Sequence, residues 1–335
     1  MLILCTLLHL AVDGVCGAAL AAYAVEEPDY ASIVYYFHLY SLIAFGFQWI
    51  AGWALDRKMS RILPGLALVP ILLGLGALPG FGILSQSVLL GAGNCLFHVA
   101  AGILVLRRYP GYREPGVFVS GGAIGLGLGL SRFCGTAVFL CICAAATAVL
   151  LFRGISSSLK IEAAEIHDHE TETFRAAPWI SAGAAVLLLL CVTLRGFSGG
   201  SGASCHVMFF PCVFAAGKAL GGVCCDAIGW RRTTAFIFIL SFAALEMMSL
   251  SLSAAWTWLP AALLAFASNM TMPLTLRLLH GCCLACPGLM FGLAAGCLLP
   301  GTFWRESFSI LPQGMIVIQF LSLFLAGSAV RRTEA

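Results

Sequence analysis

Charged residues are scarce in this sequence. They make up only 10% of its 335 residues, against 61% hydrophobic residues, and the mean hydropathy is +0.99. A soluble domain carries roughly a quarter charged residues. Since so few charges cannot cover a water-facing surface, most of the surface must face lipid. We therefore expect a multi-pass protein of the cell membrane.

Signals for other classes of protein are also missing. Continuous apolar runs, without alternation, exclude a closed β-barrel. The glycine-rich segment GGAIGLGLG at 121–129 is not followed by Lys-Ser or Lys-Thr, which excludes a phosphate-binding loop. No Ser/His/Asp or Cys/His signature accompanies the candidate residues. We expect no enzyme activity, no cofactor, no metal site and no nucleic-acid binding.

Charges and Pro/Gly turns divide the chain into apolar segments of about 20 residues, the length that spans a bilayer. We predict twelve of them: 2–22, 33–55, 62–78, 82–106, 116–133, 135–152, 178–196, 205–224, 233–253, 256–276, 284–301 and 310–329. The first segment ends in small residues like a signal peptide. It has no basic start, however, and Asp13 interrupts it, so we expect a retained helix.

Basic residues are distributed unevenly among the predicted loops. With the N-terminus inside, fourteen of them lie on the inner side and three, Arg132, Arg195 and Arg305, on the outer side. Because basic residues favour the cytoplasmic side, this asymmetry predicts that both termini are cytoplasmic. The net charge of +3 then reflects membrane topology.

A polar segment at 153–177 separates six predicted spans from six more. We predict a six-helix bundle at 1–152, a cytoplasmic linker at 153–177 and a second six-helix bundle at 178–335. The linker contains HDHE at 167–170, which is either a surface metal patch or, as we expect, part of a solvated linker. Fifteen cysteines are present, and those facing the cytoplasm are expected to stay reduced. The CxxC spacing of Cys283 and Cys286 is a weak metal signal, and helix-end packing is favoured.

The two halves contain related segments. QWIAGWALDRKMSR at 48–61 and KALGGVCCDAIGWRR at 218–232 align with an offset of 170 residues, which pairs Gly52 with Gly222 and Asp56 with Asp226. Glycines allow close helix packing, and an Asp can cap a helix N-terminus. These segments predict a cytoplasmic gate formed by Gly52, Asp56, Arg57, Arg61, Gly222, Asp226, Gly229, Arg231 and Arg232. The alternative is plain anchoring by inner basic residues.

The pattern G-x-x-x-D-x-x-G-x-R, between the second and third helices of a six-helix half, resembles the signature loop of the major facilitator superfamily. The second copy fits it closely, whereas the first has Met59 where the pattern has glycine. The resemblance covers essentially the whole chain. It implies an all-α fold of twelve transmembrane helices in two pseudo-symmetric six-helix bundles, working by alternating access.

A finer resemblance involves residues 93–129, with an FH pair followed by F-V-S-G-G, and the opening HLAVDG. These segments are similar to the fosmidomycin-resistance branch of the superfamily, which resembles drug/proton antiporters. The chain reads Gly-Leu-Ser-Arg at 129–132, where such antiporters often have Gly-Pro. The resemblance implies export of a small organic compound.

Polar residues inside the predicted spans are candidates for a substrate or proton site, because charge at bilayer depth is costly. His9 and Asp13 form an i,i+4 pair in the first span, with Asp13 about 16 Å from the cytoplasmic edge. Asn94 and His98 form another in the fourth span, at about 18 Å and 12 Å. Desolvation favours a neutral carboxyl group and a neighbouring imidazolium favours the charged one, so this set suits proton coupling. A structural hydrogen-bond pair is the alternative.

Two more residues complete the predicted site. Arg132, at the outer end of the fifth span, either attracts an anionic substrate or snorkels to the interface. Asn269 lies in the tenth span, which the resemblance places at a cavity.

The leading functional hypothesis is a monomeric, proton-coupled secondary transporter that exports a small organic compound. One alternative is an importer or uniporter of a small organic ion. Another is a non-transporting membrane receptor or scaffold with a transporter-like fold. The substrate itself is not encoded in any motif of the sequence.

Overall fold

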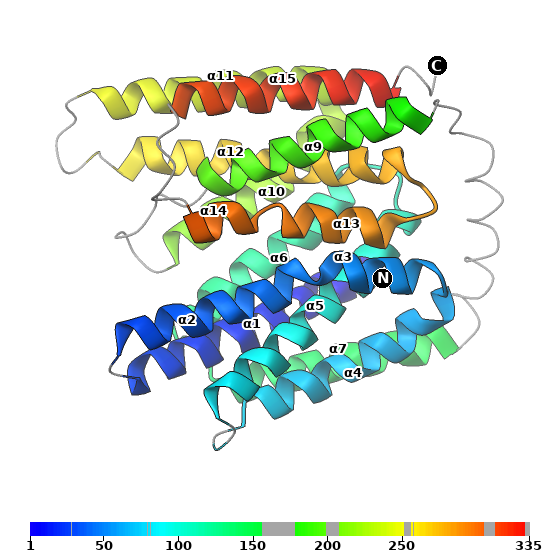
Figure 1. Cartoon of the computed structure of the whole chain (residues 1–335), viewed down its shortest axis with the longest axis vertical. Helices are drawn as coiled ribbons and strands as arrows, with labels where there is room; N and C mark the ends of the chain where they lie inside the picture. Colours follow the sequence, from blue (N-terminus) through cyan, green and yellow to red (C-terminus); the bar gives the residue numbers. More distant parts are fainter. Residues whose placement is uncertain are drawn as a thin grey trace. The chain divides into compact units, whose positions relative to one another are not determined.

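A computed structural model of the chain describes residues 1–27, 29–78, 80, 82–155, 178–198, 208–250, 256, 258–304 and 312–331 (Figure 1). Every regular element within these ranges is helical. Most of the predicted linker at 153–177, including HDHE, lies outside the described residues.

The helices follow the predicted spans. They are α1 (Leu2–Glu26), α2 (Tyr30–Ser41), η1 (Leu42–Gly46), α3 (Gln48–Asp56), η2 (Met59–Arg61), α4 (Ile62–Gly76), α5 (Ile83–Arg108), α6 (Arg113–Leu130), α7 (Thr136–Ile155), α9 (Pro178–Ser198), α10 (Phe209–Ile228), α11 (Trp230–Ser249), α12 (Trp258–Cys282), α13 (Pro287–Gly296), α14 (Leu299–Trp304) and α15 (Pro312–Arg331). Among the described residues, eleven helical segments are long and apolar enough to cross a membrane. The prediction of an all-α polytopic membrane protein is confirmed.

The predicted fifth span corresponds to α6, which is not among these eleven. Arg113 and Glu114 in its first turn lower its hydropathy. Two other spans are interrupted helices: α2, η1 and α3 together form one, and α13 with α14 forms another. The π-helical turn η1 explains the first interruption, because such turns bend a helix locally.

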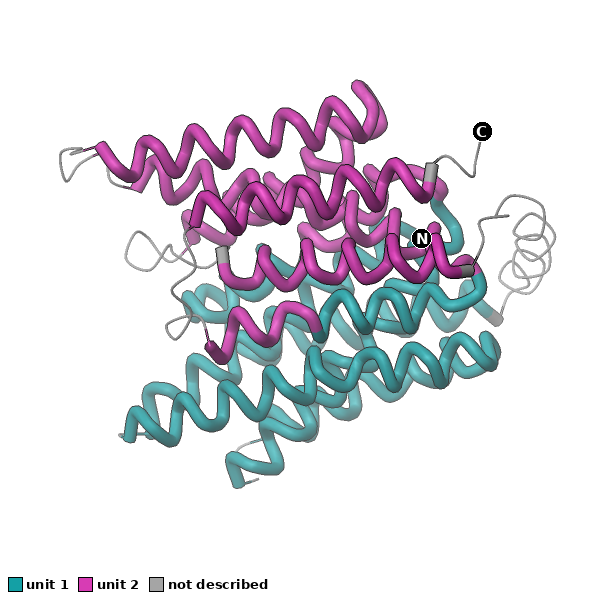
Figure 2. Tube along the Cα trace, turned by 45° about the horizontal axis from the view of Figure 1, so that its top comes forward, with its two compact units in different colours: residues 1–109, 121–172, 285–296 teal, residues 110–120, 173–284, 297–335 magenta. Residues whose placement is uncertain are grey.

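The chain forms two compact units (Figure 2). Unit 1 comprises Met1–Tyr109, Gly121–Glu172 and Ala285–Gly296, and unit 2 comprises Pro110–Ser120, Thr173–Leu284 and Cys297–Ala335. Each unit therefore includes one short segment from the other half of the sequence. The start of α6 packs within unit 2, and α13 packs within unit 1.

The same pairs of helices are neighbours in the two units. In unit 1, α1 and α4 each pack against α5 and α7; in unit 2, α9 and α11 each pack against α12 and α15. These helices hold corresponding places in the order of the two halves. The recurrence agrees with a duplicated chain, while a pseudo-two-fold axis and cytoplasmic termini stay predictions.

Apolar side chains on the outside of the units fit a lipid environment. On α4, Leu68, Ile71 and Leu75 are exposed at intervals of three and four residues, so they form one face of the helix. Polar side chains such as Gln48, Asn94 and Thr275 are buried instead. This distribution is the one expected where the surrounding medium is hydrocarbon.

Cysteines follow the predicted pattern with one exception. Many of those described in the helices, such as Cys16 and Cys191, are free and buried, whereas Cys141 and Cys212 are free and exposed. Cys283 and Cys286, in contrast, are disulfide-bonded, so the expectation of reduced thiols is wrong at these two positions. They lie in the turn between α12 and α13, where CxxC spacing favours oxidation.

A row of glycines lets α6 pack closely on α1. A Cβ atom at Gly121 would meet the carbonyl oxygen of Thr6, one at Gly125 that of Leu10, and one at Gly129 that of Gly14. Only glycine fits at these positions, and their i,i+4,i+8 spacing puts all three on one face of α6.

Replacing the central glycine should disrupt this packing. We expect Gly125→Ala to lower the free energy of unfolding by about 1–3 kcal/mol, because the new methyl group overlaps the α1 backbone. Thermal unfolding of the purified protein in detergent measures the effect. Gly74→Ala in α4 is the control, since nothing lies within 4 Å of its Cβ position. Equal melting temperatures for the two variants would contradict this account of the α1–α6 contact.

Candidate functional site

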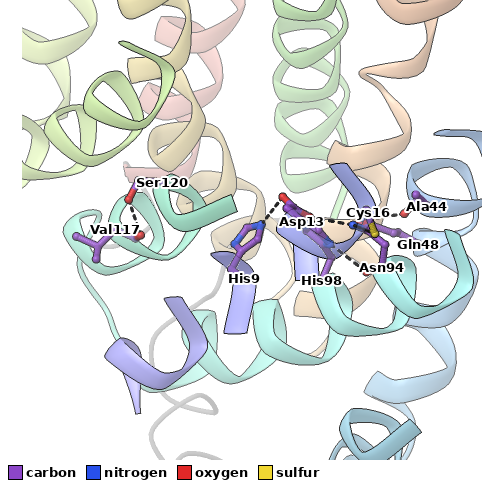
Figure 3. Close-up of polar contacts among 9 residues, drawn as sticks. All are labelled: His9, Asp13, Cys16, Ala44, Gln48, Asn94, His98, Val117 and Ser120. Atoms are coloured by element: carbon purple, nitrogen blue, oxygen red, sulfur yellow. Dashed lines mark hydrogen bonds and ion pairs between the residues drawn. The ribbon is translucent and has the colours of Figure 1, made fainter. Parts of the chain in front are cut away.

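Four of the predicted site residues come together in unit 1 (Figure 3). His9 and Asp13 lie one turn apart on α1, and His9 Nε2 is 3.4 Å from Asp13 Oδ2. Asn94 and His98 lie one turn apart on α5, and His98 Nε2 is 3.8 Å from Asp13 Oδ1. Asn94 Nδ2 donates a hydrogen bond of 2.9 Å to Asp13 Oδ1. The two i,i+4 pairs therefore meet at the Asp13 carboxylate, and we call these four residues the Asp13 cluster.

Burial differs within the Asp13 cluster. His9, Asn94 and His98 are buried, with Asn94 fully inaccessible, whereas the Asp13 side chain is 17% exposed. The carboxylate is therefore the most accessible member of the cluster. The two imidazole rings pack edge to face with centroids 4.5 Å apart, and Phe97 packs against both.

A backbone carbonyl sets the tautomer of His98. Its Nδ1 lies 2.9 Å from the carbonyl oxygen of Asn94. A carbonyl oxygen only accepts hydrogen bonds, so Nδ1 carries the hydrogen. In a neutral ring, Nε2 then presents a bare lone pair toward the Asp13 carboxylate. Two lone-pair groups facing each other favour a proton or another cation between them.

Two residues near the Asp13 cluster were not predicted from the sequence. A Cβ atom at Gly122 of α6 would overlap His9 Nε2 and Asp13 Oδ2, so glycine is required beside the carboxylate. Cys16 of α1 lies 3.8 Å from Asn94 Nδ2 through its Sγ. In the sequence, Gly122 is one of several glycines in a row, and Cys16 resembles any cysteine in an apolar helix. Neither residue carries a signal that would place it beside Asp13.

The other two predicted substrate residues lie elsewhere. Arg132 is on the exposed turn after α6 and has a φ of 54°, a left-handed conformation that is uncommon for arginine. Asn269 of α12 belongs to unit 2 and donates 2.8 Å to the carbonyl oxygen of Ala265 in its own helix. Four of the six predicted residues thus meet in unit 1, and the roles of Arg132 and Asn269 stay predictions.

Arg195 of α9 is a buried charge that the sequence analysis assigned to the outer side. It is only 7% exposed within unit 2. Its Nη1 donates to the hydroxyls of Thr271 and Thr275 in α12, at 3.4 and 3.3 Å. Its position near the C-terminal end of the seventh predicted span suggested that it lies at the membrane–water interface. Its contacts with α12 show instead that it is buried between helices.

Asp56, at the end of α3, caps the N-terminus of α13 within unit 1. Its Oδ1 accepts 2.9 Å from Gly288 N and its Oδ2 accepts 2.8 Å from Leu289 N. Gly52, one turn earlier, faces the carbonyl oxygen of Gly288 so closely that no Cβ fits. The glycine allows the α3 backbone to come close to the start of α13. The carboxylate then accepts hydrogen bonds from amide groups that the start of a helix leaves unpaired.

Asp226 makes the equivalent cap in unit 2. Its Oδ1 accepts 3.0 Å from Tyr112 N and its Oδ2 accepts 2.8 Å from Arg113 N, at the start of α6. Gly222 faces the carbonyl oxygen of Tyr112 as Gly52 faces that of Gly288. The two copies of the repeated segment thus form the same cap, each on a helix from the other half of the sequence.

The remaining gate residues differ between the copies. Gly229 has a φ of 86° at the end of α10, a conformation that favours glycine. The first copy has Met59 at the corresponding place and turns through the 3₁₀ helix η2 instead. Arg57 stacks over Trp53 at 3.8 Å and Arg231 lies 5.5 Å from the Trp230 ring, while Arg61 and Arg232 are exposed. Arg57 and Arg231 thus contact aromatic rings, and the gating role of the four arginines stays a prediction.

Removing each cap should loosen only the helix that it caps. Because a cap contributes about 1–2 kcal/mol, we expect Asp56→Ala to accelerate amide exchange at the start of α13 by roughly 5–30-fold. Asp226→Ala should do the same at the start of α6. Hydrogen–deuterium exchange read by mass spectrometry measures both.

Asp29→Ala is the matched control, since Asp29 caps α2 through Ala31 N and Ser32 N. It should accelerate exchange at α2 and leave α13 and α6 unchanged. Unchanged exchange at α13 in Asp56→Ala would contradict the role given to this carboxylate.

No protein-family model and no curated protein sequence matches the chain. A solved structure does: a bacterial homologue of the iron transporter ferroportin, in an outward-facing state with soaked iron. The TM-score is 0.56 at 12% identity, and the match covers 100% of this chain and 99% of the other. The comparison does not support the specific likeness to the fosmidomycin-resistance branch. The chain therefore shares the fold of this membrane transporter.

Proposed function

We propose that the protein is a secondary transporter working by alternating access, which exports a small organic compound in exchange for protons. Asp13 is the proton carrier in this proposal. The observation that carries it is the position of one partly accessible carboxylate between two buried imidazoles, on helices α1 and α5 that are long enough to span a membrane.

Burial supports a coupling role for Asp13. An ionisable group at bilayer depth costs several kcal/mol unless it is paired or reached by water, and such groups usually belong to ion or substrate pathways. The proton of the Asp13 carboxyl can be shared with His9 or His98. A small displacement of α1 therefore changes whether the proton resides on Asp13 or on an imidazole.

The two aspartate caps support alternation. Each cap ties the loop after one half's second span to a helix of the other sequence half, Asp56 to α13 and Asp226 to α6. In this proposal a movement of one sequence half away from the other breaks the two caps, at about 1–2 kcal/mol each. A penalty of that size is within the range that ligand binding can overcome.

Transport in proteoliposomes tests the proposal. The panel contains small organic cations, weak acids and phosphonates, including fosmidomycin, chosen first by thermal shift. With wild-type protein, an imposed pH gradient should raise the transport rate of at least one compound about tenfold. Asp13→Asn should abolish the dependence on the gradient because the proton carrier is gone. Asp29→Asn, which alters an exposed acid outside the Asp13 cluster, should behave like wild type.

The rival functions give different results. Equal gradient-driven transport by Asp13→Asn and wild type would overturn proton coupling through Asp13. Exchange that ignores the gradient in both proteins would indicate a uniporter. Failure of wild-type protein to move any compound, with or without a gradient, would favour a receptor or scaffold.

A further inference from the structure

We propose that the Asp13 cluster is a binding site for one divalent first-row transition-metal ion, such as Mn²⁺, Fe²⁺, Co²⁺ or Zn²⁺. The sequence analysis expected no metal site. The inference concerns the residues on which the proposed function rests, but metal binding does not require transport and is measured without it.

The spacing of the ligand atoms fits a bridging ion. One nitrogen each from His9 and His98 and an oxygen of Asp13 all lie within 4.8 Å of one another. The closest separations, 3.4 Å and 3.8 Å, exceed the 2.7–2.9 Å or so of a charge-assisted hydrogen bond. Two ligands about 2.1 Å from an ion at a tetrahedral angle lie about 3.4 Å apart. The carboxylate and imidazoles are therefore spaced as ligands of a common ion.

The hydrogen bond of His98 to its own helix supports this assignment. Metal-binding histidines almost always donate the second ring nitrogen to a carbonyl or carboxylate, which fixes the ring and its tautomer. His98 Nδ1 donates 2.9 Å to the carbonyl oxygen of Asn94, which directs the unprotonated Nε2 toward Asp13.

Asn94 provides an independent observation. Its side chain is fully buried, and its Oδ1 accepts no hydrogen bond from any residue that the structure describes. Its Nδ2 already points at Asp13 Oδ1. Because the two ends of an amide are exchanged by a half-turn, Oδ1 can take the place of Nδ2 beside Asp13. A metal ion there would gain a fourth ligand and would satisfy a buried acceptor.

The donor set selects the kind of ion. Two imidazoles, one carboxylate and one amide oxygen suit borderline divalent ions of the first transition row. Mg²⁺ prefers oxygen ligands and keeps several waters of its own, whereas two of the ligands in this set are imidazole nitrogens. Ca²⁺ requires six to eight or so oxygen ligands, which this set does not offer.

Metal binding to purified full-length protein tests the assignment. The protein is prepared without a histidine tag and treated with a chelator to remove bound metal. It is then titrated with Co²⁺ in detergent. We expect one Co²⁺ per chain, visible absorption bands typical of nitrogen and oxygen ligands, and imidazole scattering in the X-ray absorption spectrum. Isothermal titration with Zn²⁺ gives the affinity.

Variants locate the site. Asp13→Asn and His98→Gln should each weaken binding about tenfold or more, as removal of a ligand does. Asn94→Asp should tighten binding, because a carboxylate replaces a neutral ligand. A misfolded variant would bind more weakly, so tighter binding distinguishes a ligand at position 94 from a structural residue. His38→Gln is the matched control, since His38 lies on α2 outside the cluster. Size-exclusion profiles and melting temperatures show that each variant is folded.

The outcomes are separate from those of the transport assay. The assignment is overturned if wild-type protein binds no stoichiometric Co²⁺, or if His38→Gln weakens binding as much as His98→Gln. It is also overturned if Asn94→Asp weakens binding in a folded protein. Loss of gradient-driven transport in Asp13→Asn, with or without metal binding, concerns the proposed function alone.

Discussion

The structure of unit 1 depends on how closely α1 approaches α5 and α6. Hydrocarbon offers no partner for a carboxylate, so Asp13 is tolerable only if neighbouring helices supply one. The bare backbone of α6 at Gly122 and Gly125 lets α1 lie near enough for that to happen. On the other side, α5 supplies an amide and an imidazole. The packing of small residues and the burial of polar residues are thus one constraint. The glycines let the helices come close enough for α5 to supply the polar partners of Asp13.

The aspartate caps show the same principle at the ends of helices. Asp56 and Asp226 each bind two amide groups at a helix start, and each has a glycine one turn earlier that admits the partner's backbone. A carboxylate with two short bonds to amide groups is favoured further by the positive end of the helix dipole. Each cap links the end of a helix in one sequence half to the start of a helix from the other half. The two copies of the repeated segment therefore make equivalent contacts between the sequence halves.

Much of the fold followed from the sequence because hydrophobic length is a strong signal. The predicted spans correspond to observed helices, and the capping role of Asp56 and Asp226 was inferred from their place in a repeat. The meeting of His9 and Asp13 with Asn94 and His98 followed from i,i+4 spacing and similar depth. Packing between helices carries no such periodic signal. The burial of Arg195 against Thr271 and Thr275, and the fit of Gly122 on the Asp13 cluster, depend on neighbours far apart in sequence. Likewise, the disulfide-bonded state of Cys283 and Cys286 depends on a loop geometry that CxxC spacing permits but does not impose.

Helix α5 connects the cap in unit 1 to the Asp13 cluster. Gly102 of α5 packs on the ring of Phe291 in α13, the helix that Asp56 caps, and Arg107 Nη2 donates 3.4 Å to the carbonyl oxygen of Ala285 just before α13. His98 lies one turn before Gly102 on the same helix. Because a helix is a nearly rigid element, these contacts with α13 and the Asp13 cluster belong to one body, α5. One helical turn of α5 therefore separates the contact with the capped helix α13 from the Asp13 cluster.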